Sequence, residues 1–201
     1  MTKRIQAVLF DVIETLFPLE PVGRKLTGAG LPASSLEVWF ARLLRDAFAL
    51  DAAGSYRGFR EVAAGALEVT FASSGLSRSR EAIDEVLGAF AALDPHPEVA
   101  SAFERLAPAG VTIATLTNGS AENTRKLLER ASLLHHVRHV IGVDEVKHWK
   151  PRREVYLHGA RVAGAEPPRV ALVAAHAWDV LGAREAGLAT GWVSRLEKTF
   201  H

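Results

Sequence analysis

The chain contains no cysteine, and this absence excludes several kinds of chemistry at once. Without cysteine there are no disulfide bonds, no thiolate nucleophile and no cysteine-bound zinc, and nothing points to secretion. Net charge is also nearly absent, because 24 basic and 23 acidic side chains leave a formal charge of +1 over 201 residues. Nucleic-acid binding is favoured by an excess of positive charge, so this balance argues against a DNA- or RNA-binding role.

Long apolar runs are missing as well. The first apolar stretch, residues 5–10, is ended by Asp11. It is too short for a signal peptide with its cleavage site, and far shorter than the roughly 20 residues of a membrane helix. No other stretch of the sequence meets either requirement. We therefore expect a cytoplasmic protein without a membrane partner.

The chain does contain a series of short apolar runs that end in polar residues. Such runs are typical of strands buried on both faces of a parallel sheet. They lie at residues 5–10, 111–116, 139–143, 170–174 and 191–193. Helical segments alternate with them at residues 98–106, 121–131, 152–163 and 180–186. This alternation predicts an α/β fold with a doubly wound, mostly parallel, Rossmann-like sheet.

One long stretch interrupts the alternation. Residues 18–93 contain no convincing strand, and their apolar side chains recur at helical spacing between turns rich in Gly and Ser. We therefore predict an inserted α-helical cap over residues 18–93 and an α/β core formed by residues 1–17 and 94–201. A cap over the carboxyl edge of the sheet would enclose a pocket of the kind in which ligands commonly bind.

Four polar positions follow apolar runs: Asp11, Thr117 with Asn118, Lys150, and Asp179. Each one alone has an ordinary interpretation, as a turn former, an Asn-Gly turn, a solvated loop or a helix cap. In an open α/β sheet, however, reactive groups lie just beyond the carboxyl ends of the strands. The ordered set therefore predicts a functional site at that edge.

The residues around these positions resemble four known motifs. The segments are FDVIETLF at 10–17, LTNGS at 116–120, WKP at 149–151 with Tyr156 beyond it, and AHAWD at 175–179. They are similar, in order and spacing, to the motifs of the haloacid dehalogenase superfamily, and they span nearly the whole chain. The helical insertion directly after the first motif matches the superfamily's first type of cap.

The subgroup is indicated by departures from the commoner phosphatase pattern. Phosphatases of the superfamily carry a second Asp two residues after the nucleophile, where this chain has Ile13, and a pair of acidic residues in the fourth motif, where only Asp179 remains. A hard dication needs several oxygen ligands, so this set is thin. The 2-haloacid dehalogenases share an apolar or aromatic residue at the Ile13 position, Asn-Gly-Ser and Ala-Trp-Asp.

The resemblance implies hydrolytic dehalogenation of a short 2-haloalkanoic acid to a 2-hydroxy acid without a required cofactor. Asp11 would attack the carbon that carries the halogen and form an ester, which water then hydrolyses. Lys150 would keep Asp11 ionised, Thr15 and Thr117 would hydrogen-bond the nucleophile, and Asp179 would position or deprotonate the water. Weak Mg²⁺ binding at Asp11 and Asp179 stays open.

Further residues are expected on the substrate side. Asn118 and the indole of Trp178 would donate toward the departing halide, and His176 toward the substrate carboxylate. The superfamily's cap supplies an Arg beside a Trp, but here Trp39 is followed by Phe40, so Arg42 is the candidate to replace it. The remaining residues expected to line the substrate site are Ile13 and Tyr156.

Glu14 is another departure, since the superfamily usually has Gly at this sharp turn. A residue other than Gly is strained at positive φ, so the sequence indicates either strain or a different turn.

Two other functions stay open. One is a Mg²⁺-dependent phosphatase acting on a small molecule, and the other is a binding protein that keeps the fold but has lost catalysis. The expected partner is a small anionic substrate. A homodimer formed through the cap helices is a further alternative.

Overall fold

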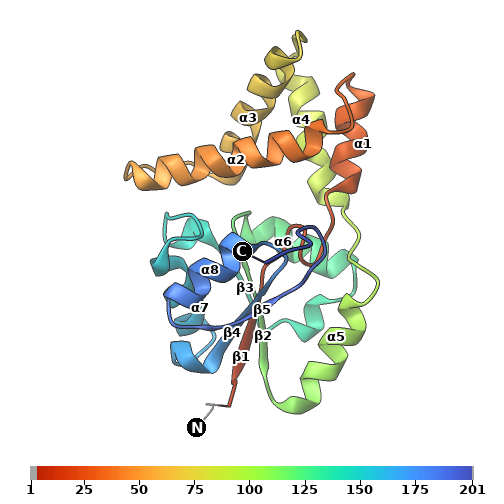
Figure 1. Ribbon diagram of the computed structural model, residues 1–201. Helices are drawn as coiled ribbons and strands as arrows, with labels where there is room; N and C mark the ends of the chain where they lie inside the picture. The colour runs from red at the N-terminus through yellow and green to blue at the C-terminus, as the bar shows by residue number, and fades with distance from the viewer. Residues whose placement is uncertain (1–3, 201) are drawn as a thin grey trace. The chain divides into compact units, whose positions relative to one another are not determined.

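The computed structural model describes residues 4–200 and divides the chain into two compact units (Figure 1). One unit contains the chain up to Phe17 and from Asp94 onward, and the other contains Pro18–Leu93. The first is an α/β unit and the second is helical.

The α/β unit is built on one sheet of five parallel strands in the order β3-β2-β1-β4-β5. The strands are β1 (Ala7–Phe10), β2 (Thr112–Thr117), β3 (His139–Gly142), β4 (Val170–Ala174) and β5 (Ala189–Trp192). Every residue of β1 is buried, as expected for the central strand of a sheet covered on both faces. The predicted parallel α/β fold is confirmed.

The last strand begins earlier than the sequence indicated. We predicted it at residues 191–193, whereas β5 starts at Ala189, which pairs with Ala171 of β4. Its first residues, Ala and Thr, give little apolar signal, and the pairing with β4 rather than hydrophobicity defines the strand.

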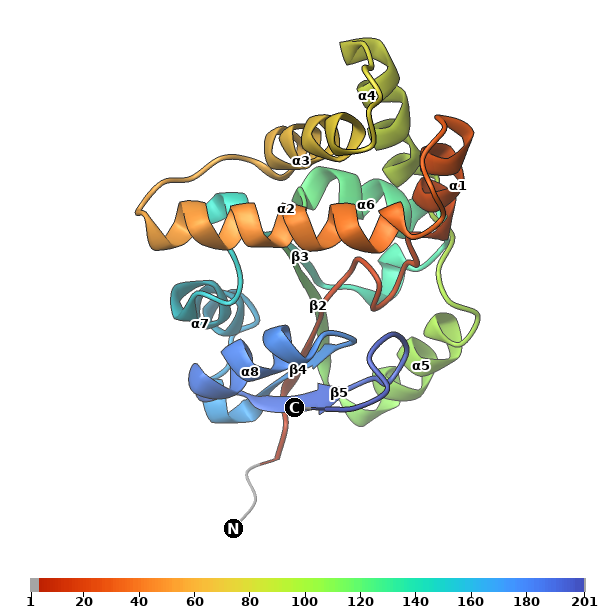
Figure 2. The ribbon, with the colours of Figure 1, turned by 45° about the horizontal axis from the view of Figure 1, so that its top comes forward.

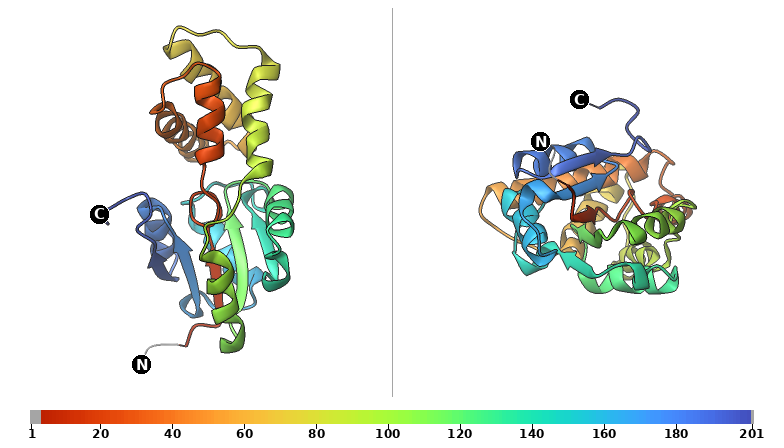
Figure 3. Two further views of the ribbon diagram at one scale, coloured as in Figure 1. Left: turned by 90° about the vertical axis from the view of Figure 1, so that its right-hand side faces the viewer. Right: turned by 90° about the horizontal axis from the view of Figure 1, so that it is seen from below.

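Helices connect the strands and lie on both sides of the sheet. The α-helices are α5 (Val99–Leu106), α6 (Ala121–Arg130), α7 (Arg153–Val162) and α8 (Ala177–Glu185). Short 3-10 turns are η2 (Ala107–Ala109), η3 (Leu134–His136), η4 (Val143–Glu145) and η5 (Pro167–Arg169). Helices α7 and α8 pack against each other on one side of β1, and α5 lies on the other side (Figures 1 and 3).

Helix α8 starts three residues before the predicted position. His176 has extended backbone angles and precedes the first helical residue, Ala177, so Asp179 lies in the first helical turn. The run Ala-Trp-Asp has no strong apolar periodicity, and this concealed the first turn from the sequence analysis.

The strand order places β1 between β2 and β4. Phe10, the last residue of β1, pairs with Thr115 on one side and Val173 on the other. The polar residues that follow these strands therefore meet at one edge of the sheet, as ligand-binding residues do in open α/β folds.

The helical unit contains α1 (Glu20–Gly28), α2 (Ser35–Ala52), α3 (Phe59–Ser73), α4 (Arg80–Gly88) and the short η1 (Ala89–Ala92). Figure 2 shows α2 and α3 alongside each other, and they are in contact. Their shared core includes Trp39, whose indole N–H donates to the Ala63 carbonyl over 3.1 Å. Within the described chain, none of the helices is both long enough and apolar enough to cross a membrane.

The loop after β1 forms a tight turn around Glu14. The amides of Leu16 and Phe17 both donate to the Val12 carbonyl, and the Glu14 amide donates to Phe17. Glu14 has φ = +68°, the left-handed conformation that favours Gly. The turn is therefore formed despite the Glu, and the strain indicated by the sequence is present.

Replacing Glu14 tests this strain. Glu14→Gly and Glu14→Ala both remove the carboxylate, but only the Ala variant keeps a Cβ in the left-handed region. We expect the Gly variant to be more stable than the Ala variant by about 1 kcal/mol, measured by urea unfolding. Equal stability of the two variants would contradict this prediction.

Candidate active site

A buried ammonium group joins two carboxylates at the carboxyl edge of the sheet. Asp11 follows β1 directly, Asp179 lies in the first turn of α8, and Lys150 lies in the loop before α7. The Lys150 Nζ lies 3.0 Å from Asp11 Oδ1 and 2.8 Å from Asp179 Oδ2. The structure thus brings together three of the residues that the sequence placed in one site.

Burial makes these charges depend on one another. Lys150 and Asp179 are fully buried, and Asp11 is only 7% exposed. Burial lowers the pKa of Lys150, but the two carboxylates outweigh it and hold the pKa above its usual value. Burial raises the pKa of Asp179, with Lys150 opposing the rise. Lys150 is therefore a permanent cation at neutral pH.

Tyr156 belongs to the same cluster. It was expected to contact substrate, but it is fully buried on α7, and its hydroxyl donates to Asp179 Oδ1 over 2.7 Å. Burial and the neighbouring Asp179 charge raise the pKa of Tyr156 well above 10, so it stays a phenol and a donor. The structure therefore shows a contact of Tyr156 with a carboxylate, and its contact with substrate stays a prediction.

Thr15 orients the other oxygen of Asp11. Its hydroxyl donates to Asp11 Oδ2 over 2.7 Å and accepts the amide of Ala175 over 2.9 Å. Since Lys150 holds Oδ1, both oxygens of Asp11 have a fixed partner. The expected hydrogen bond from Thr15 to Asp11 is present.

The loop after β2 makes different contacts from those expected. The Thr117 hydroxyl was expected to bond Asp11; the hydrogen bond that the structure shows at this hydroxyl is the one its oxygen accepts from the Gly119 amide over 2.9 Å. The Asn118 Oδ1 accepts the backbone amide of Lys150 over 2.9 Å. Within residues 4–200, the buried Asn118 Nδ2 has no hydrogen-bond partner. This amide is therefore a donor that a ligand could use.

His176 lies in the loop between β4 and α8, and Trp178 lies in the first turn of α8. Their rings stack with centroids 5.6 Å apart and an interplanar angle of 19°. His176 is 8% exposed, and its Nδ1 lies 3.7 Å from Glu197 Oε1. The expected contact of His176 with a substrate carboxylate stays a prediction.

Two further candidates make contacts that do not involve the Asp11–Lys150–Asp179 cluster. Ile13 is part of the turn after β1, where it forms an isolated bridge with Phe17. Arg42 lies on α2 in the helical unit, and its Nη1 donates to Thr70 Oγ1 over 3.1 Å. Its role as the substitute for the superfamily's cap arginine stays a prediction.

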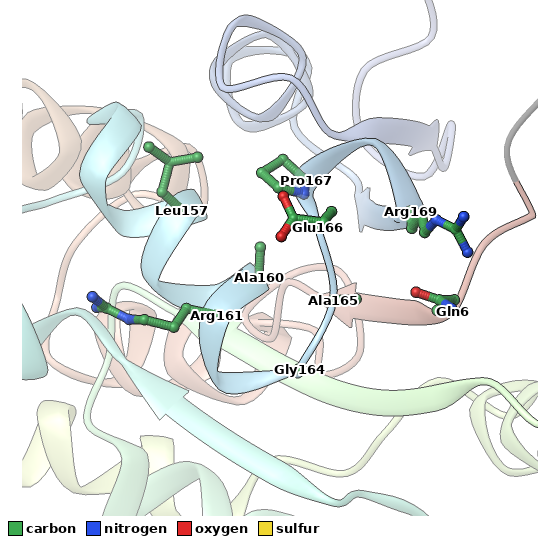
Figure 4. Close-up of a pocket in the computed structure, with 9 residues that line it drawn as sticks. All are labelled: Gln6, Leu157, Ala160, Arg161, Gly164, Ala165, Glu166, Pro167 and Arg169. Atoms are coloured by element: carbon green, nitrogen blue, oxygen red, sulfur yellow. The ribbon is translucent and has the colours of Figure 1, made fainter.

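The structure also has a cavity at the other end of the strands. It has a volume of about 660 Å³ and lies beside the residues that precede β1 and β4 (Figure 4). Its lining residues are Gln6, Leu157, Ala160, Arg161, Gly164, Ala165, Glu166, Pro167 and Arg169. None of them is a predicted site residue, so the cavity is separate from the Asp11 cluster.

Sequence reasoning missed the residues that hold the loop before α8. The Trp192 indole N–H donates to the Ala175 carbonyl over 3.2 Å, and Glu197 Oε2 accepts the Ala177 amide over 2.7 Å. Both residues come from the end of the chain. No spacing rule connects an acidic residue in the final segment with a helix start twenty positions earlier.

The fold and this edge together define a class. A parallel doubly wound sheet with a buried Asp–Lys–Asp cluster at its carboxyl edge is the arrangement expected of an enzyme that uses a carboxylate for covalent catalysis. The chain belongs to the haloacid dehalogenase-like hydrolases, because the model of that family matches residues 5–187.

Individual relatives agree with this family. The chain is 30% identical over 198 residues to (S)-2-haloacid dehalogenase 1 of Pseudomonas sp. strain CBS-3, covering 96% of this chain and 86% of that protein. Its structure is similar to L-2-haloacid dehalogenase from Xanthobacter autotrophicus, with a TM-score of 0.88, 29% identity and coverage of 96% and 79%. A structure of that enzyme with chloropropionic acid covalently bound matches at a TM-score of 0.87, 28% identity and the same coverage.

Gly182 of α8 tests the packing behind the cluster. A Cβ at this position would lie 2.6 Å from the Tyr156 hydroxyl and 2.6 Å from Pro151 Cβ. We expect Gly182→Ala to cost about 1–3 kcal/mol of stability and to shift the Tyr156–Asp179 hydrogen bond. Gly65→Ala in α3 is the control: no atom lies within 4 Å of that Cβ, and we expect an unchanged or slightly higher stability. Equal effects of the two changes in urea unfolding would contradict the prediction.

Lys150→Met tests the buried charge cluster. Removing the ammonium leaves two buried carboxylates uncompensated, and we expect a loss of about 3–5 kcal/mol near neutral pH. Asp179 already has a raised pKa in the folded state, so its ionisation lowers stability as the pH rises through that value. Without Lys150 this cost grows, and the loss should be larger at pH 8 than at pH 5.

The control for this change is Lys126→Met on α6. Lys126 pairs with Glu122 at the surface, so its removal should change stability little and equally at both pH values. Urea unfolding of both variants at the two pH values gives the measurement. A pH-independent loss in Lys150→Met would show that the two carboxylates do not depend on its charge.

Proposed function

We propose that this protein hydrolyses short 2-haloalkanoic acids to 2-hydroxy acids through an ester formed on Asp11. The observation that carries the proposal is the Lys150 ammonium between Asp11 and Asp179, because it places a cation supplied by the chain itself against the nucleophile. The relatives named above, with their 2-haloacid dehalogenase activity, support the same reaction.

In the first step, a carboxylate oxygen of Asp11 attacks C2 of the substrate. The new C–O bond forms as the carbon–halogen bond breaks, and the halide leaves with the electron pair. No proton has to be supplied to a halide, which agrees with Ile13 at the position where a phosphatase has its acid. The covalently bound chloropropionic acid in the Xanthobacter enzyme supports such an intermediate.

In the second step, water attacks the acyl carbon of Asp11. Asp179 accepts the proton of the water, and the raised pKa that burial gives this carboxyl suits a general base. The bond between the acyl carbon and the alkyl oxygen then breaks, Asp179 returns its proton to the departing alkoxide, and the 2-hydroxy acid leaves. The second proton of the water passes from Asp11 to solvent. Asp11 returns as a carboxylate, and one oxygen of that carboxylate comes from water.

Substrate binding would use donors near the same edge. The buried Asn118 Nδ2, without a partner in the described chain, is suited to donate to the departing halide. Trp178, His176 and Arg42 complete the proposed contacts with halide and substrate carboxylate. The substrate itself is a small anion.

Exposed Val38 and Val69 on the helical unit are compatible with a contact between two copies of the chain.

The donor set fits a magnesium ion poorly. Both oxygens of Asp179 already accept hydrogen bonds, from Tyr156 and Lys150, and one oxygen of Asp11 accepts from Lys150. Across residues 4–200, no group of three or more His, Cys, Asp or Glu side chains is placed to hold a metal ion. We therefore assign no step of the reaction to a metal.

Halide release from 2-chloropropionate and other short 2-haloacids tests the proposal. We expect release by the wild type, equal with and without a chelator, and none above background from Asp11→Asn. The surface variant Asp84→Asn should keep wild-type activity. Single turnover in ¹⁸O-labelled water should place the label in Asp11 before it reaches product.

The other outcomes identify the alternatives. Label found directly in product, with Asp11 unlabelled, would refute the ester. Turnover of phosphoesters that a chelator abolishes, without halide release, would indicate the phosphatase. No turnover of either substrate class would favour the non-catalytic binding protein.

A further inference from the structure

The final segment of the chain is attached to the loop that carries the fourth motif. Glu197 Oε2 accepts the amide of Ala177, the first residue of α8, over 2.7 Å. The other oxygen of the same carboxylate lies 3.7 Å from His176 Nδ1. Glu197 therefore contacts two successive residues of this loop.

This contact lies at a helix end that lacks a cap of its own. The residue before α8 is His176, and its side chain makes no capping hydrogen bond to the helix. A helix start leaves backbone N–H groups without partners and carries a partial positive charge, so a carboxylate there is stabilising. Glu197, from a distant part of the sequence, supplies the acceptor that a capping residue would supply locally.

The segment is itself held in place by two contacts that precede Glu197 and by one that follows it, because the ring of Phe200 packs against Trp192 with centroids 5.6 Å apart. Trp192, at the end of β5, donates to the Ala175 carbonyl over 3.2 Å. Arg195 forms an ion pair with Glu98 at the start of α5. The Glu197 carboxylate is thus presented by an anchored segment rather than by a side chain reaching from a free end.

The loop between these contacts is directly connected to the reacting groups. The Ala175 amide donates to the Thr15 hydroxyl, which donates to Asp11. Asp179 lies two residues beyond Ala177, in the same helical turn. The position of residues 175–177 therefore sets both the hydrogen bond on the nucleophile and the location of the proposed base.

We infer that Glu197 is a positioning residue for the second step of the proposed reaction. It holds the start of α8 so that Asp179 keeps the place from which it accepts the proton of the attacking water. The first step depends less on this contact, because Lys150 holds Asp11 independently of the loop. The inference rests on the proposed function for its kinetic part, and on the loop contacts alone for its structural part.

The test compares Glu197→Ala with Glu197→Gln. The Ala variant loses the acceptor, and we expect kcat to fall about five- to tenfold with a smaller change in KM. Because the second step slows, rapid quenching followed by mass spectrometry should find the Asp11 ester accumulating. The Gln variant keeps an oxygen acceptor and should restore kcat to within about twofold of wild type.

Ser79→Ala is the matched control. Ser79 caps α4 by accepting the amide of Ala82, so its loss removes a comparable hydrogen bond in the helical unit without touching the Asp11 cluster. We expect wild-type kcat and no accumulated ester in this variant. If Ser79→Ala slows the second step as much as Glu197→Ala does, the effect of Glu197 comes from a general loss of stability. That result would overturn the inference.

Hydrogen exchange gives a readout that needs no turnover. In Glu197→Ala the amides of residues 175–180 should exchange faster than in wild type, whereas those of α4 should be unchanged. Unchanged exchange at residues 175–180, or an active Glu197→Ala variant without accumulated ester, overturns the inference while leaving the dehalogenase proposal intact. A wild type that releases no halide refutes the proposed function and with it the kinetic role of Glu197.

Discussion

The Lys150 ammonium is the constraint on which the rest of the site depends. Two carboxylates that lie this close in a buried place repel each other and favour protonation, unless a cation lies between them. Lys150 supplies that cation from within the chain, with contacts of 3.0 and 2.8 Å. The β1 and α8 ends are therefore held together by charge as well as by packing.

Much of the fold and part of the site could be predicted from the sequence. Apolar runs buried on both faces identify parallel strands, and the residues just past them must converge at one edge, so Asp11, Lys150 and Asp179 are found together. The first helical turn of α8 and the first half of β5 were not predicted. Their residues carry little apolar periodicity, and tertiary contacts decide their conformation.

Side-chain partners were less predictable than positions. Thr117 lies at the expected edge, yet the hydrogen bond at its hydroxyl comes from the Gly119 amide of its own turn. Tyr156 lies in the expected motif, and Gly182 lets α8 approach so closely that the phenol also donates to Asp179, a contact that was not predicted. Glu197 gave no signal at all, because a helix cap supplied across the fold leaves no local spacing in the sequence.

The Thr15 hydroxyl can point its hydrogen in only one direction. Its oxygen already accepts the Ala175 amide, so the O–H bond is directed at Asp11. Once Asp11 carries an alkyl group, its oxygens lose their negative charge and the hydrogen bond from Thr15 weakens. Because the same Thr15 hydroxyl accepts the Ala175 amide, the weakening of its bond to Asp11 affects the backbone of the β4–α8 loop. In the proposed reaction, a change at Asp11 would thereby reach the segment that carries Asp179 at the step in which water gives up its proton.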